Sequence, residues 1–127
     1  MPSGLPKPTD AELEILTALW SRGASTVREI HEIVLKRKPT QYTTVLKLLQ
    51  IMSEKGLVRR NEEQRAHVYE AAVPRDLTRK QLAGDLLQRA FDGSAARLLQ
   101  GALSARKASK AELAEIRKML SEYERRI

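Results

Sequence analysis

The sequence has no cysteine in its 127 residues and only two histidines, His31 and His67. Without cysteine there is no disulfide framework, no thiolate metal site and no cysteine nucleophile. Two histidines are too few to form a metal site alone, so we expect both to be structural and expect no metal or cofactor. Aromatic side chains make up only 4% of the residues. Proteins that bind single-stranded nucleic acid usually offer more rings for base stacking.

Long apolar runs are also absent from the sequence. No stretch approaches the roughly 18 apolar residues that a membrane-spanning helix needs. Residues 1–8 have no apolar core that could serve as a signal peptide, so we expect a cytoplasmic protein without membrane insertion. No convergent set of nucleophile, base and orienting residue is visible, and we therefore expect no enzymatic activity.

Positive charge is what the chain has in excess. The net charge is +7 and the isoelectric point is near 10.0. Residues 1–35 carry three Lys or Arg against five Asp or Glu, whereas residues 36–65 carry eight against three. This balance favours an anionic partner such as nucleic acid, although an acidic protein or a lipid surface would also fit.

Two helices are predicted in the first third of the chain. Residues 1–8 hold three prolines and a glycine and are expected to form a disordered arm. Thr9 and Glu12 have the spacing of a capping box, so a first helix begins there. Ser25 or Thr26 caps a second helix of about three turns, whose apolar residues recur at helical spacing.

A third helix and a β-hairpin follow. Pro39 interrupts the second helix, and Thr40 is expected to cap a third helix that Gly56 ends. Alternating apolar and polar residues then predict two strands, residues 57–60 and 66–71, joined by a charged turn.

The order helix, helix, helix, hairpin predicts a winged helix-turn-helix domain over residues 9–73. In such a domain the third helix enters the major groove of DNA. The predicted fold class is therefore mainly α with a small β-hairpin (α+β). The alternative is a generic small α+β domain without this role.

Residues 74–127 are predicted to be wholly helical. One helix follows Pro74 and ends at Gly93, a short one spans about 95–103, and a last one begins at Ser109. Apolar residues three and four apart give these helices a seam typical of helix pairing. We expect a homodimerisation domain, with packing of these helices onto the first domain as the alternative. The expected dimer-interface residues are Leu82, Leu86, Phe91, Leu98, Leu113, Ile116, Leu120 and Tyr123.

Three runs carry a family resemblance: QYTTVL at 41–46, EKGLVRR at 54–60 and RAHVY at 65–69. They resemble the penicillinase-repressor family, also called methicillin-resistance regulators or copper repressors, and the resemblance covers nearly the whole chain after residue 8. It implies a repressor of transcription that binds a palindromic operator in double-stranded DNA as a homodimer. The contacts would come from a recognition helix, residues 40–55, and a wing, residues 61–66.

The residue types in these segments suit DNA contacts. Tyr42 and Thr43 are the best candidates for contacts to base edges in the first turn of the third helix. Arg65, together with Gln64, is expected to meet phosphates or the minor groove from the wing tip. Arg60 is a weaker candidate, because arginines on strands often only extend into solvent from the exposed face of a sheet. The complete set of candidates is Gln41, Tyr42, Thr43, Thr44, Lys47, Arg60 and Arg65.

The chain departs from the family pattern in two places. In the antibiotic-responsive members that it resembles, a membrane sensor metallopeptidase leads to cleavage of an Asn-Phe pair, and Gly101-Ala102 stands there in this sequence. Copper-responsive members bind Cu(I) through C-terminal cysteines, which this chain lacks. The inducing signal is therefore unassigned, and nothing in the sequence supports a small-molecule pocket.

Two other functions fit the same fold. A winged-helix adaptor would bind protein instead of DNA, but its third helix would usually present aromatic or aliphatic anchors in place of polar side chains. An activator or architectural protein would share the DNA-binding residues. Only the position of the bound site relative to a promoter separates an activator or architectural protein from a repressor.

Overall fold

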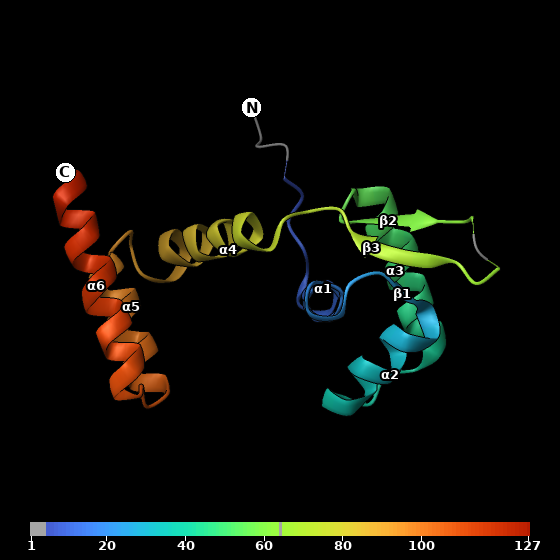
Figure 1. The fold of residues 1–127 in the computed structure, drawn as a ribbon, viewed down its shortest axis with the longest axis horizontal. Coiled ribbons are helices and arrows are strands. Elements are labelled where there is room, and N and C mark those ends of the chain that lie inside the picture. The colour runs from blue at the N-terminus through green and yellow to red at the C-terminus, as the bar shows by residue number, and fades with distance from the viewer. Residues whose placement is uncertain (1–4, 64) are drawn as a thin grey trace. The chain divides into compact units, whose positions relative to one another are not determined.

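The computed structural model describes residues 5–63 and 65–127. The elements confirm the predicted fold class, with three helices before the hairpin and three after it (Figure 1). In chain order they are α1 (Asp10–Arg22), β1 (Ser25–Thr26), α2 (Val27–Arg37), α3 (Tyr42–Lys55), β2 (Val58–Asn61), β3 (Val68–Ala71), α4 (Arg75–Ala90), α5 (Ala95–Ala105) and α6 (Lys110–Arg126).

The chain divides into two compact units, one ending at Ala83 and the other beginning at Gly84. We call them the winged unit and the C-terminal unit. The division lies within α4 and later than the boundary after residue 73 that the sequence suggests. The first turns of α4 belong to the winged unit, since Thr78 is completely buried there.

Capping boxes fix the starts of α1 and α2. The backbone N–H of Glu12 donates to the Thr9 hydroxyl at 3.2 Å, and the backbone N–H of Thr9 donates to the Glu12 carboxylate at 2.9 Å. Thr26 and Glu29 repeat this arrangement at α2, so the cap of α2 is Thr26 and not Ser25. These bonds satisfy N–H groups that a helix start otherwise leaves without acceptors.

The sheet has three antiparallel strands in the order β1-β3-β2. The expected two-stranded hairpin is therefore incomplete, because Ser25 pairs with Tyr69 and adds β1 at the other edge of β3. This third strand has only two residues, and Thr26 also caps α2. No period-two pattern can develop over so short a segment.

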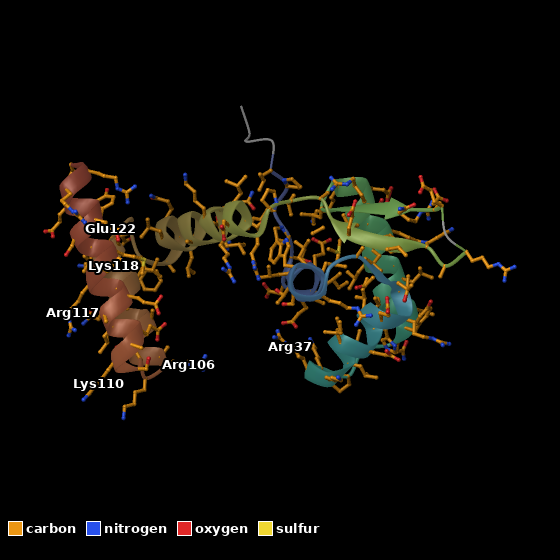
Figure 2. The ribbon with its side chains drawn as sticks, viewed as in Figure 1. Arg37, Arg106, Lys110, Arg117, Lys118 and Glu122 are labelled. Carbon is orange, nitrogen blue, oxygen red and sulfur yellow. The ribbon has the colours of Figure 1, made fainter. Side chains whose placement is uncertain are left out.

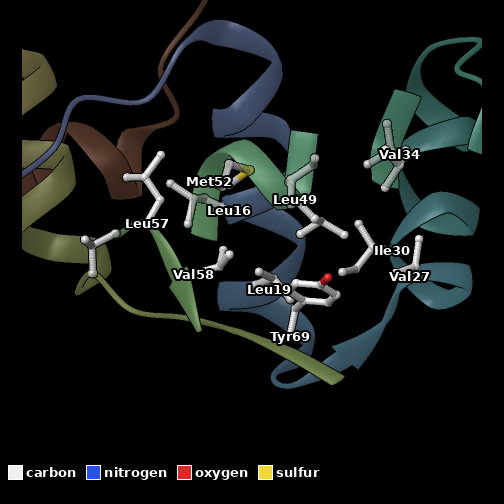
Figure 3. Packing of buried hydrophobic residues seen from close by; sticks show 13 residues of the cluster. Leu16, Leu19, Val27, Ile30, Val34, Leu49, Met52, Leu57, Val58 and Tyr69 are labelled. Atoms are coloured by element: carbon white, nitrogen blue, oxygen red, sulfur yellow. The ribbon is translucent and has the colours of Figure 1, made fainter. Parts of the chain in front are cut away.

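One hydrophobic core joins the helices and the sheet of the winged unit (Figure 3). Tyr69 from β3 packs among aliphatic side chains from α1, α2 and α3. The indole N–H of Trp20 donates to the carbonyl oxygen of Val73 at 3.0 Å, which ties α1 to the segment after β3. The core residues are Ile15, Leu16, Leu19, Val27, Ile30, Val34, Val45, Leu49, Met52, Leu57, Val58, Tyr69 and Val73.

Part of the expected N-terminal arm packs on the winged unit. Leu5 contacts the core and Pro8 is buried. The carbonyl oxygen of Leu5 accepts a hydrogen bond from Gln81 at 2.8 Å, and that of Lys7 accepts one from Lys55 at 3.1 Å. Residues 5–8 are thus held in place, while residues 1–4 of the expected arm lie outside the described residues.

A buried carboxylate lies at the start of α1. Glu12 is only 2% exposed and accepts a hydrogen bond from the Lys55 ammonium at 2.6 Å. Burial raises the pKa of Glu12, but the hydrogen bonds from Lys55 and Thr9 and the charge of Lys55 outweigh it, so the pKa lies below its ordinary value of 4.5. The ion pair therefore stabilises the folded state.

Replacing Glu12 by glutamine should lower the free energy of unfolding at pH 7 by about 1–3 kcal/mol. The pKa of Glu12 is lower in the folded protein, so its contribution is complete above pH 4.5 and is lost as pH falls through the folded pKa. Urea unfolding at several pH values should show the difference from wild type shrinking below pH 4.5. Glu14→Gln is the control, since this exposed carboxylate lies 3.4 Å from Arg37 and should contribute less than about 0.5 kcal/mol. A constant deficit across this pH range would contradict the assignment.

The C-terminal unit has a different character. Neither α5 nor α6, whose residues are all described, contains a buried residue. Helix α5 continues through Gly101, where an added Cβ would come within 3.4 Å of the Phe91 ring. The glycine thus lets Phe91 pack closely on α5. Over residues 5–63 and 65–127, no helix has both the length and the apolarity needed to cross a membrane.

Candidate nucleic-acid interface

Helix α3 buries one side and exposes the other. Val45, Leu49 and Met52 are completely buried and anchor the helix in the core, where Leu49 and Met52 are seen in Figure 3. On the other side the helix is polar. The candidates Gln41, Thr43, Thr44 and Lys47 are all exposed. The sequence-based separation of a buried and a polar side of α3 is therefore present in the structure.

Gln50 joins this polar side although it was not among the predicted residues. It is exposed and lies three residues after Lys47 and seven after Thr43, so the three side chains project from the same side of α3. A glutamine amide can make a paired hydrogen bond to the edge of adenine. The helical spacing from Thr43 was a sufficient signal to find it.

Tyr42 lies apart from these residues. It is seven residues before the buried Leu49 and therefore starts α3 on the side that faces the core. Tyr42 is 45% exposed, and its ring meets the ring of His31 edge to face, with centroids 5.7 Å apart. The structure thus brings Thr43, Lys47 and Gln50 together and places Tyr42 beside α2.

The start of α3 differs from the predicted one. Gln41 is the N-cap residue, and its side chain makes no capping hydrogen bond. The prediction that Thr40 caps the helix is wrong, because the Thr40 hydroxyl donates to the carbonyl oxygen of Lys38 at 2.9 Å. Thr40 is therefore part of the turn that follows α2.

Positive side chains gather around this turn. Lys36 and Lys38 are exposed, as is Lys47 on α3, and none of them has an ion-pair partner among the described residues. Arg37, at the end of α2 (Figure 2), lies 3.4 Å from the Glu14 carboxylate. Unpaired lysines beside a polar helix face provide positive charge for phosphate groups.

The hairpin that carries the wing has balanced charge. Residues 58–71 contain three arginines and three glutamates. Arg60 contacts the Glu62 carboxylate at 3.1 Å, and Arg59 contacts Glu70 at 3.3 Å. The pKa of Arg60 is raised above its ordinary value, first by a hydrogen bond with Tyr69 and then by Glu62.

Arg65 differs from the two hairpin arginines Arg59 and Arg60. It is exposed, with no ion-pair partner among the described residues, whereas the neighbouring candidate Gln64 lies outside them. The wing therefore offers one unpaired positive side chain near its tip. Within the same residues no group of three His, Asp or Glu side chains is placed to hold a metal ion.

The sequence model of the penicillinase repressor family matches residues 8–122. The chain belongs to the penicillinase repressor family. The match includes all of the polar side of α3 and the wing, and it extends into α6. It therefore covers both units of the chain and not only the winged unit.

The chain is similar to the curated transcriptional regulator BlaI of two Mycobacterium tuberculosis strains. It is 38% identical over 84 residues, which make up 65% of this chain and 61% of the regulator. The aligned part is thus less than two thirds of the length of that relative.

Two solved structures resemble part of this chain. The solution structure of the DNA-binding domain of the repressor BlaI has a TM-score of 0.51 and 24% identity, and covers 59% of this chain and 90% of that domain. The monomeric form of Bacillus licheniformis BlaI in complex with the blaP half-operator has a TM-score of 0.50 and 24% identity, with coverages of 56% and 87%. At these identities the likeness shows the winged-helix fold.

Proposed function

We propose that this chain is a transcriptional repressor, with no enzymatic activity, that binds a palindromic operator as a homodimer. The observation that carries the proposal is the polar side of α3, where Thr43, Lys47 and Gln50 project from a helix that the core holds firmly. A helix fixed in this way can enter the major groove without losing its orientation. Membership of the penicillinase repressor family supports the same function.

The exposed residues divide into two kinds of contact. Gln41, Thr43, Thr44 and Gln50 carry amides and hydroxyls, which suit base edges. Lysines and arginines without ion-pair partners suit phosphates, and they contribute affinity that depends on salt and not on sequence. Lys47 and Arg65 belong to this second kind. Arg60 is a poorer candidate, because Glu62 already neutralises it.

The C-terminal unit supports homodimerisation. Leu120 is 52% exposed and Tyr123 is 59% exposed on one side of α6. Lys110 and Arg117 are seven residues apart and lie on the same side of α6 (Figure 2). An apolar stripe on helices that bury no residue of their own is best satisfied by a second copy of the same unit.

The other expected interface residues fall into two groups. Leu86 is also well exposed, like Leu120 and Tyr123. The remaining members are half-buried within the single chain and would line the interface less directly. These residues are Leu82, Phe91, Leu98, Leu113 and Ile116.

Thr43→Ala and Arg65→Ala test the proposed division of contacts. Thr43→Ala removes a base contact and should weaken binding to a duplex selected from a random pool by on the order of tenfold, with less than about twofold loss on a scrambled duplex. Arg65→Ala removes a phosphate contact and should weaken binding to both duplexes and reduce the slope of log affinity against log salt concentration by about one. Fluorescence anisotropy over a salt series measures both effects.

Ser53→Ala is the matched control for Thr43→Ala, because it removes an exposed hydroxyl near the other end of α3. Its binding should equal that of wild type. If wild type bound no duplex at low ionic strength, the proposed function would be wrong and the adaptor alternative would be favoured. Equal losses on both duplexes for both variants would refute the division of contacts alone.

A further inference from the structure

The first turn of α3 lacks the side-chain cap that starts four of the other helices. In α1, α2, α5 and α6 a serine or threonine side chain accepts a hydrogen bond from the third backbone N–H of the helix. Gln41 makes no such bond at α3. A polar N-cap usually stabilises a helix start by about 1 kcal/mol. Something other than a side-chain cap must therefore fix where α3 begins.

A histidine from α2 contacts the residue just before this cap. Nε2 of His31 lies 2.7 Å from the carbonyl oxygen of Thr40. A carbonyl oxygen can only accept, so the imidazole N–H donates. His31 is half-buried, which limits competition from water for this bond.

The same imidazole contacts the residue just after the cap. Its ring meets the Tyr42 ring at an interplanar angle of 87°, the edge-to-face geometry that aromatic pairs favour. His31 thus contacts residues on both sides of Gln41. One side chain from α2 thereby fixes the last residue of the turn and the first residue of α3 relative to each other.

We propose that His31 is a positioning residue that sets the start of α3 and, through it, the direction of Gln41, Thr43 and Thr44. Its effect on DNA rests on the proposed function, whereas its effect on α3 does not. Tyr42 acts in this arrangement as the partner of His31, which accounts for its position away from the polar side of the helix.

Three substitutions separate the two contacts. His31→Ala removes both, His31→Gln keeps an N–H donor near the position of Nε2, and His31→Phe keeps the ring edge without a donor. His31→Ala should weaken binding to the selected duplex by on the order of tenfold and to the scrambled duplex by less than about twofold. The glutamine and phenylalanine variants should each recover part of this loss.

A double-mutant cycle with Tyr42→Leu tests the ring contact. The two substitutions should be non-additive in the affinity for the selected duplex, because each removes the same contact. Leu35→Ala is the control for changes to α2, since Leu35 is exposed one turn after His31. It should bind both duplexes like wild type.

Amide hydrogen exchange tests the same inference without DNA. The backbone N–H groups of Thr44 and Val45 donate to the carbonyl oxygen of Gln41 at 3.1 and 3.2 Å. In His31→Ala these two amides should exchange faster by on the order of tenfold, while core amides such as that of Leu49 keep their wild-type rates. His31→Gln should give intermediate rates, and it serves as the informative variant if His31→Ala does not fold.

The outcomes distinguish this inference from the proposed function. Unchanged exchange at Thr44 and Val45 would overturn the role of His31, whether or not the protein binds DNA. Equal loss on the selected and the scrambled duplex would overturn its role in sequence discrimination. A wild-type protein that binds no duplex, together with faster exchange in His31→Ala, would refute the proposed function and leave the positioning role intact.

Discussion

Replacing Leu49 by alanine is expected to lower the free energy of unfolding of the winged unit by about 3 kcal/mol. Leu49 is completely buried between Val45 and Met52, where α3 meets the core. The substitution removes buried apolar surface and leaves a cavity, because a packed core relaxes only partly around a missing side chain. Urea unfolding followed by the fluorescence of Trp20 measures the loss.

The control for Leu49→Ala is Ile51→Ala on the same helix. Ile51 is 37% exposed, so its substitution should change the free energy of unfolding by less than about 1 kcal/mol. Because Trp20 is hydrogen-bonded to Val73 within the winged unit, its fluorescence reports on the unfolding of this unit. Similar losses in the two variants would mean that α3 does not bury the side described above.

Replacing Leu120 by aspartate is expected to convert a dimer into a monomer. A carboxylate in an apolar interface loses its hydration without gaining a partner, which costs several kcal/mol. Sedimentation velocity over a range of protein concentrations measures the change. The affinity for a palindromic duplex should fall by on the order of 100-fold, since the second half-site then binds independently.

Ser121→Asp is the control for the dimer prediction. It introduces the same charge at the next residue of α6, which is exposed and lies outside the apolar stripe. This variant should remain dimeric. If wild type sedimented only as a monomer, or if Leu120→Asp left the dimer intact, the interface proposed for α6 would be wrong.

The sequence was sufficient for several features whose signal is local. The capping box of Thr9 and Glu12 and the glycine after α3 depend on residues a few positions apart, and both are present in the structure. The buried side of α3 could also be predicted, because Val45, Leu49 and Met52 recur at helical spacing. Local order and periodicity thus predict the element order and the polar side of α3.

The sequence was insufficient where contacts join distant residues. Strand β1 forms because Ser25 meets Tyr69, which lies far along the chain, and two residues alone carry no strand pattern. Threonine is a typical helix cap, but the imidazole of His31, nine residues earlier, donates a hydrogen bond to the carbonyl oxygen of Thr40 in the turn before α3. The contact of Arg59 with Glu70 likewise depends on the hairpin register, because the two residues face each other across β2 and β3.

Amide chemical shifts recorded during titration with a selected duplex test the central claim most directly. The account predicts the largest changes at Thr43, Lys47 and Gln50, with smaller ones near Arg65 in the wing. Unchanged shifts along α3 at low ionic strength, or changes confined to α5 and α6, would contradict it.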